Sequence, residues 1–290
     1  MAELDALRLD KRRLRAKFNR AASGYDEAAV LQHEVAERMQ ERLDLIKLKP
    51  RIVLDVGAGT GFGSFSLLRR YRGASVLALD LASEMLREIR RRSGWLRRPL
   101  LVGGDAEDLP LSDGRVDLLW SNLTLQWCND LDRAFAEFRR VMGPGGLLMF
   151  STFGPDTLKE LRGAWAQADR QTHVNAFIDM HDIGDALLRA GFADPVMDVE
   201  TITMTYRDVR ALMRDLKQIG AANATRGRPR AMTGRGRLAR VEAAYETSRR
   251  PDGLLPATYE VVYGHAWAPE GPPPARPPGR PVPIPIRAGD

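Results

Sequence analysis

The spacing of apolar residues changes near residue 50, where a helical pattern gives way to a short buried strand. Over residues 28–46 apolar side chains recur at steps of three and four, as on one face of an amphipathic helix, and Lys49-Pro50 ends the pattern. Residues 51–56 are instead mostly aliphatic and β-branched, and glycines follow at once. These patterns predict a helix that leads into a strand buried on both faces.

Strand and helix patterns then alternate as far as residue 152. Because crossover helices join parallel strands and cover both faces of their sheet, this alternation predicts a doubly wound α/β fold with a mainly parallel sheet. The further predicted strands lie at 75–79, 100–102, 116–120 and 147–152, and the helices at 64–71, 83–92 and 131–142.

The second half of the chain is more helical, and both ends differ from the rest. Residues 1–26 are basic, and we expect them to form a helical lid, whereas the proline-rich residues 268–290 are expected to be disordered. One domain should span residues 27–267, with halves at about 50–152 and 153–267. The later helices are predicted at 156–169, 180–190 and 207–219, and the later strands at 196–206 and 259–267.

Composition narrows the class of protein without choosing a function. The 290 residues are 44% hydrophobic and carry a formal net charge of +6, which suits a globular protein with an acidic partner or ligand. The only cysteine is Cys128 and the four histidines lack metal-ligand spacing, so we expect no metal. No apolar run approaches the roughly 20 residues of a membrane span, and no secretory signal is evident. A cytoplasmic location is therefore expected.

A glycine-rich turn with a preceding acid joins the first strand to the next helix. It reads Asp55-Val56-Gly57-Ala58-Gly59-Thr60-Gly61. Glycines here let the backbone approach a ligand closely and aim helix N–H groups at it. The third glycine of a dinucleotide fingerprint would fall at Phe62, so the turn departs from that motif.

Acids follow at the ends of the next two strands. Asp80 lies about 20 residues past the turn, where an acid can accept ribose hydroxyls. This arrangement resembles the S-adenosylmethionine-dependent methyltransferases of the Rossmann-like class I. The resemblance implies S-adenosylmethionine as cofactor and S-adenosylhomocysteine as product. The cofactor residues it implies are Asp55, Gly57, Ala58, Gly59, Gly61, Asp80, Leu81, Met85, Asp105, Ala106, Glu107 and Asn122.

The exit of the fourth predicted strand argues against methylation of an amino group. It reads SNLTLQWCND (121–130) and lacks the Asn/Asp-Pro-Pro-aromatic motif of many N-methyltransferases. Together with FNRAA (18–22), GPDTLKELR (154–162), HVNAF (173–177) and PATYEVVYGHAW (256–267), it resembles the malonyl-[acyl-carrier protein] O-methyltransferases of biotin synthesis. The resemblance covers about residues 10–268.

This resemblance implies methyl transfer from S-adenosylmethionine to the free carboxylate of a malonyl thioester. A carboxylate is already ionised at pH 7, so no general base is required, and the protein has to place the oxygen behind the methyl group and exclude water. The methyl ester then primes pimeloyl synthesis. The helical residues that follow 152 are expected to form an insertion on the acceptor side.

Candidate residues for the transfer step lie in the lid and at the sheet edge. We expect Tyr25 to close the cofactor site and reach the carboxylate, with Asn122, Gln126 and Trp127 beside it. Plain core packing of Tyr25 or Trp127, and a solvated basic helix face for the cations, are the alternative interpretations. The candidate substrate residues are His173, Asn175, Phe177, Tyr206, Arg210, Arg214 and Lys217.

Two basic stretches, residues 11–17 and 226–240, are candidate docking surfaces for an acidic acyl carrier protein. Malonyl-CoA is a second acceptor to test, and a monomer is expected. Nucleic acid is not expected, because aromatic residues do not interleave with these cations. Two other functions stay open: a related hydroxylase or assembly factor for respiratory complex I, and an RNA-directed methyltransferase-fold binding protein.

Overall fold

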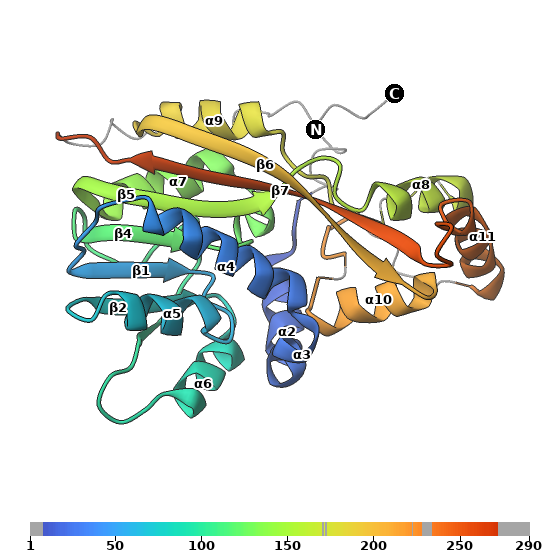
Figure 1. Ribbon diagram of the computed structural model, residues 1–290, viewed down its shortest axis with the longest axis horizontal. Helices are drawn as coiled ribbons and strands as arrows, with labels where there is room; N and C mark the ends of the chain where they lie inside the picture. The colour runs from blue at the N-terminus through green and yellow to red at the C-terminus, as the bar shows by residue number, and fades with distance from the viewer. Residues whose placement is uncertain (1–7, 170, 172, 222, 228–233, 272–290) are drawn as a thin grey trace.

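The computed structural model describes residues 8–169, 171, 173–221, 223–227 and 234–271 (Figure 1). A seven-stranded sheet in the order β3-β2-β1-β4-β5-β7-β6 forms its centre. The first five strands in this order are parallel, and β7 is antiparallel to both β5 and β6. The doubly wound, mainly parallel prediction is therefore confirmed. The strands are β1 (Ile52–Val56), β2 (Ser75–Asp80), β3 (Leu100–Gly103), β4 (Val116–Ser121), β5 (Met142–Phe153), β6 (Ala193–Tyr206) and β7 (Leu255–Trp267).

Helices cover both faces of the sheet and bury alternate residues of each strand. In β1, Val53 belongs to the core beneath α4 and α5, whereas its neighbour Leu54 belongs to the core beneath α7 and α9. Short 3₁₀ turns lie at Ala22–Gly24 and Leu125–Trp127. The helices are α2 (Lys11–Ala21), α3 (Tyr25–Ala28), α4 (Val30–Asp44), α5 (Phe62–Arg70), α6 (Ser83–Arg92), α7 (Leu131–Val141), α8 (Lys159–Ala168), α9 (Met180–Arg189), α10 (Val209–Gln218) and α11 (Arg235–Glu246).

Several helices begin where an aspartate side chain accepts a hydrogen bond from the first turn. Asp10, Asp130, Asp179 and Asp208 cap α2, α7, α9 and α10 in this way. Because this capping chemistry is local, the predicted starts of α7 and α9 agree with the structure. The predicted helix at 156–169 instead begins at Lys159, since the preceding Leu158 has a left-handed backbone (φ 56°).

The long antiparallel strands carry the second half of the chain beyond the parallel sheet. Figure 1 shows β6 and β7 running past the other strands toward α8, α10 and α11. β6 and β7 pair from Ala193 with Trp267 to Tyr206 with Leu255. This pair therefore holds the helical insertion beside the carboxyl ends of β4 and β5.

The N-terminal segment contacts both the cofactor half of the domain and the acceptor-side insertion. The backbone N–H of Leu9 donates to Asn129 Oδ1 (2.7 Å) near the cofactor half, and that of Asp10 donates to the carbonyl of Ala224 (3.0 Å) in the insertion. Figure 1 shows α2 and α3 between the sheet and α10. The expected helical lid is therefore tied down at both sides.

Two predicted boundaries shift for identifiable reasons. β5 begins at Met142 rather than at 147, because Met142 already pairs with Val116 before a register shift. Ala268, the first residue of the predicted tail, is buried and exchanges backbone hydrogen bonds with Gly145 and Gly146. The buried Arg139 donates to the carbonyl oxygens at 269 and 271. The start of the tail therefore packs on the domain, and residues 272–290 lie outside the described residues.

Candidate active site

The glycine turn lies where β1 has β2 on one side and β4 on the other, at the carboxyl edge of the sheet. Ligands of open α/β sheets bind at such a switch point. Gly57, Gly59 and Gly61 all have positive φ (76°, 54° and 95°), which favours glycine. The N–H groups of Gly57 and Ala58 donate to the carbonyl of Leu79, so the turn is fastened to β2.

A small cavity of about 90 Å³ lies over this turn. The side chain of Asp80 faces it and accepts hydrogen bonds from the N–H of Gly59 (2.9 Å) and of Ala82 (2.7 Å). The cavity brings together eight of the cofactor residues expected from the sequence. They are Gly57, Gly59, Asp80, Leu81, Met85, Asp105, Ala106 and Asn122.

Three other predicted cofactor residues support the turn and do not line this cavity. Asp55 is buried, and its carboxylate accepts a hydrogen bond from Ser64 Oγ (2.5 Å) in α5. Ala58 is held through its backbone, and Gly61 starts α5 in a left-handed conformation. Contact of these three residues with the cofactor therefore stays a prediction.

Glu107 also lies outside the cavity lining. Its Oε1 accepts the backbone N–H groups of Asn129 (3.0 Å) and Asp130 (2.7 Å), so it positions the segment after the Leu125–Trp127 turn. Lys11 of α2 forms ion pairs with Asp105 (2.9 Å) and with Glu107. Lys11 also lines the cavity. From the sequence it was expected only to belong to a basic stretch. Because Lys11 and Asp105 are 94 residues apart in the chain, no local sequence pattern predicts their contact.

Two buried carboxyl groups make the turn sensitive to pH. Burial raises the pKa of Asp80 to about 6, although the N–H groups of Ala82 and Gly59 favour its charged form. Burial, with a smaller contribution from the charge of Asp80, raises the pKa of Asp55 to about 7 despite the hydrogen bond from Ser64. The folded protein therefore retains protons here that an unfolded chain releases.

We expect Asp55→Asn to stabilise the protein at pH 8 more than at pH 5. The folded pKa of about 7 exceeds the ordinary value of about 3.9, so wild-type stability falls as the pH rises between these values. Asparagine keeps an acceptor oxygen for Ser64 and has no proton to lose. Urea unfolding should show the variant gaining on the order of 2 kcal/mol more at pH 8 than at pH 5. An equal difference at both pH values would contradict this account.

A much larger cavity, of about 1140 Å³, opens between the lid, the sheet edge and the insertion. It is larger than the roughly 300–1,000 Å³ of most small-molecule pockets. Three of the four catalytic candidates (Tyr25, Gln126 and Trp127) and most substrate candidates line it. Those substrate candidates are His173, Asn175, Phe177, Tyr206, Arg214 and Lys217.

Arg210 is the exception among the substrate candidates. Its exposed guanidinium pairs with Glu242 of α11 and does not line the cavity. Arg214 and Lys217 follow on the same helix at steps of four and three, but they lie nearer its C-terminal end. Helical spacing predicts a shared face correctly and cannot tell how far along the helix a cavity extends. A role of Arg210 in substrate binding therefore stays a prediction.

The two cavities share a wall. Phe18, Tyr25, Leu123 and Trp127 line both of them. The rings of Phe18 and Trp127 meet edge to face, with centroids 5.4 Å apart. Groups bound in the two cavities would therefore approach each other at this wall.

Asn122 and Gln126 use their amides to position the wall. Asn122 donates through Nδ2 to the carbonyl of Gln32 (2.9 Å) and accepts through Oδ1 from Ser151 Oγ (2.7 Å). Gln126 donates to the carbonyl of Leu123 and accepts from Thr152 Oγ1 (3.2 Å). Asn122 lines only the small cavity and Gln126 only the large one.

Tyr25 remains protonated over the physiological range. Burial, followed by the carboxylates of Asp80 and Asp26, raises the pKa of its hydroxyl well above the ordinary value. Its ring contacts Ala22, Ala82 and Met85 in a small apolar cluster. The hydroxyl can therefore donate a hydrogen bond, and it cannot act as a base near pH 7.

The insertion supplies the far side of the large cavity. His173 stacks on Trp165 (3.6 Å between centroids) and hydrogen-bonds to Asp169 (2.9 Å), so its ring is held in place. Phe177 meets Phe153 edge to face. Burial and the nearby carboxylate of Asp215 raise the pKa of Tyr206 to about 12. These aromatic side chains give the large cavity mostly apolar walls. The polar atoms at their edges are available to an acceptor.

Two further structural features bear on the class of protein. Among the described residues, no group of three or more His, Cys, Asp or Glu side chains is arranged to hold a metal ion. No helix within the described ranges is long and apolar enough to cross a membrane.

Comparison with known proteins places this architecture in a family. A family model described as a methyltransferase domain matches residues 54–150. An S-adenosylmethionine-dependent methyltransferase of Thermotoga maritima shares the fold, with a TM-score of 0.53 and 17% identity over 88% of this chain and 99% of that one.

Two relatives named malonyl-[acyl-carrier protein] O-methyltransferase are much more similar in sequence. That of Laribacter hongkongensis is 59% identical over 91% of this chain and 92% of its own. That of Halorhodospira halophila is 55% identical over 93% and 92%. The chain therefore belongs to the malonyl-[acyl-carrier protein] O-methyltransferase family of S-adenosylmethionine-dependent enzymes.

Proposed function

We propose that this protein transfers the methyl group of S-adenosylmethionine to the free carboxylate of a malonyl group carried by acyl carrier protein. The product is the methyl ester that primes pimeloyl synthesis in biotin biosynthesis. Membership of the family supports this reaction. The shared wall of Phe18, Tyr25, Leu123 and Trp127 is the observation that carries it, because transfer needs two ligands that meet end to end.

The residues around the small cavity fit the cofactor. Gly57 and Gly59 leave room for a close approach to the backbone, and Asp80 offers carboxylate oxygens to ribose hydroxyls. Leu81 and Met85 supply an apolar surface for adenine, and Asp105 with the backbone of Ala106 supplies polar groups for its edge. When bound, S-adenosylmethionine supplies a sulfonium methyl group that a carboxylate oxygen attacks, while the broken S–C bond leaves its electron pair on sulfur.

The lid has to move before the cofactor binds. The small cavity measures about 90 Å³, well below the size of a pocket for a nucleoside. Lys11, Leu14 and Phe18 of α2 form part of its lining, so a displacement of α2 would enlarge it. Closure afterwards would exclude water from the transfer wall. We therefore assign residues 1–26 the role of a lid, of which the structure describes residues 8–26.

At the wall the protein orients a carboxylate that needs no deprotonation. Hydroxyl and amide donors suit this task better than an arginine, because strong ion pairing would lower the nucleophilicity of the oxygen. Tyr25 is a permanent donor, and Gln126 has an amide at the acceptor side. Trp127 and Phe18 supply the apolar part of the wall. Their common function is to align the oxygen with the methyl group.

An acidic carrier protein fits the basic surface beside the insertion. Arg226, Arg235, Arg237 and Arg240 belong to this stretch, whereas Arg228 and Arg230 lie outside the described residues. Arg237 also pairs with Asp169, next to the cavity residue His173. We propose a monomer. The free Cys128 suits the reducing cytoplasm.

Transfer of radiolabelled methyl tests the proposal. The purified protein is mixed with labelled S-adenosylmethionine and malonyl-carrier protein, with acetyl-carrier protein as the matched control and malonyl-CoA as a second acceptor. We expect base-labile label on the malonyl carrier alone, and slower labelling of malonyl-CoA. Cofactor binding without transfer to any acceptor would overturn the proposal and favour the assembly-factor alternative.

A further inference from the structure

We infer that Lys17 and Lys217 bind the phosphate of the acceptor's phosphopantetheine arm. The two residues come from α2 and α10 and line the same large cavity. This inference rests on the proposed function, because it assumes that a malonyl thioester occupies that cavity. It adds a phosphate-binding site at the end of the cavity opposite Leu123.

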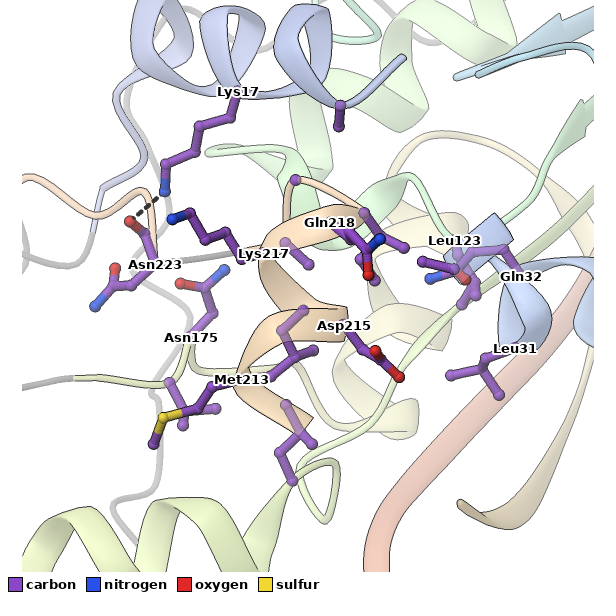
Figure 2. Close-up of a pocket in the computed structure, with 18 of the residues that line it drawn as sticks. Lys17, Leu31, Gln32, Leu123, Asn175, Met213, Asp215, Lys217, Gln218 and Asn223 are labelled. Carbon is purple, nitrogen blue, oxygen red and sulfur yellow. Dashed lines mark hydrogen bonds between the residues drawn. The ribbon is translucent and has the colours of Figure 1, made fainter. Parts of the chain in front are cut away.

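The two lysines lie away from Leu123, one of the four residues of the wall. Figure 2 shows Lys17 and Lys217 extending toward one end of the cavity, where Asn175 and Asn223 also lie. Leu123, a member of the wall, lies toward the opposite end in the same view. A ligand that spans the cavity from Leu123 to the lysines needs an extended shape. A pantetheine arm has this extended shape.

Contacts between the lid and the insertion hold the two lysines in one region. Lys17 Nζ donates to the backbone carbonyl of Asn223 (2.6 Å), as the dashed line in Figure 2 marks. Gly220 follows α10 and approaches α2 so closely that a Cβ there would lie 3.0 Å from the Phe18 ring. Leu9 and Thr225 form an isolated β-bridge nearby. The site therefore needs both the closed lid and the insertion.

The charge of the cavity lining favours an anion. The described lining contains four cationic side chains, Lys17, Arg20, Arg214 and Lys217, and one carboxylate, Asp215. An anion at this end would be attracted by both ammonium groups. The malonyl carboxylate has to lie beside the methyl group of the cofactor, so it does not occupy the end of the cavity that holds the lysines. The remaining anionic group of the acceptor is the phosphate of its arm.

An unpartnered amide oxygen beside the lysines supports the same orientation of the pantetheine arm. Among the described residues, buried Asn175 Oδ1 has no hydrogen-bond partner, and Asn175 lines the cavity. A buried acceptor without a donor is costly, so a ligand that brings an N–H group would be stabilised here. Pantetheine carries two amide N–H groups between its phosphate and its thioester. The arm thus matches both the lysines and the amide.

Two substrates that differ only by the phosphate test this inference. Methylation of malonyl-phosphopantetheine and malonyl-pantetheine is measured for wild type, Lys17→Met and Lys217→Met. Wild type should show a kcat/KM about tenfold higher for the phosphorylated substrate, and each variant should lose most of that preference. Lys47→Met makes the same chemical change at an exposed position outside the cavity and should keep the preference.

The outcomes separate this inference from the proposed reaction. Absence of transfer to either substrate would count against the reaction itself. Transfer to both at equal efficiency by wild type, or equal losses on both substrates in the variants, would overturn the phosphate site while leaving the reaction in place. Lys217→Arg should restore part of the preference, since arginine also binds phosphate.

Discussion

Gly57→Ala should weaken S-adenosylmethionine binding at least about 100-fold, because the new methyl group has no room and the backbone disfavours it. A Cβ at Gly57 would overlap Thr124 Oγ1 and lie 2.6 Å from Thr124 Cγ2, and φ is +76°. Thr124 Oγ1 also bonds to the carbonyls of Val56 and Asn122, so it cannot retreat without disturbing the end of β4. Calorimetric titration of the folded variant measures the effect.

Gly114→Ala is the matched control for backbone strain. Gly114 has a similar φ of +65°, and a Cβ at this position would have no atom within 4 Å. This variant therefore isolates the conformational cost, about 1–2 kcal/mol. Its cofactor affinity should equal that of wild type. Thr124→Ala added to Gly57→Ala removes the two closest atoms and should recover part of the affinity. Wild-type affinity in Gly57→Ala alone would refute the steric argument.

Tyr25→Phe should lower kcat between about tenfold and a hundredfold while changing the KM for S-adenosylmethionine little. Tyr25 is half-buried and lines both cavities, and a hydrogen bond from its hydroxyl to a charged group contributes about 1.5–3 kcal/mol. The ring, which contacts Ala82 and Met85, remains in phenylalanine. Steady-state methylation of malonyl-carrier protein separates kcat from KM.

Tyr71→Phe is the control for Tyr25→Phe, since Tyr71 follows α5 and lines neither cavity. It should leave both constants unchanged. Tyr25→Ala should lose more activity than Tyr25→Phe, because it also opens the wall to water. An unaltered kcat in Tyr25→Phe would remove the hydroxyl from the transfer step and leave Tyr25 a packing role.

The order of the elements could be predicted because its signals are local. The change from helical spacing to a buried strand near residue 50 needs only neighbouring residues, and the observed β1 and α4 follow it closely. The glycine turn is equally local, since three positive φ angles demand a residue without a Cβ. Gly57, Gly59 and Asp80, which the sequence predicts as cofactor residues, line the small cavity.

The sequence does not predict the direction of every side chain at the site. Asp55 stands at the right turn, yet its carboxylate points to Ser64 beneath the turn. Glu107 belongs to the right segment, yet it binds the backbone at Asn129 and Asp130. Position within a motif determines where the backbone lies. The direction of a side chain depends on the donors that the fold brings near it.

The sequence by itself determined the doubly wound sheet, the ligand-binding turn and the family, because periodicity, turn chemistry and motif spacing are properties of short segments. Only the tertiary structure decided that Lys11 closes on Asp105 across 94 residues and that Lys17 reaches Asn223 across 206. It also decided that Arg210 faces away from the cavity. Such contacts depend on how distant segments pack, and no spacing within one segment records that packing.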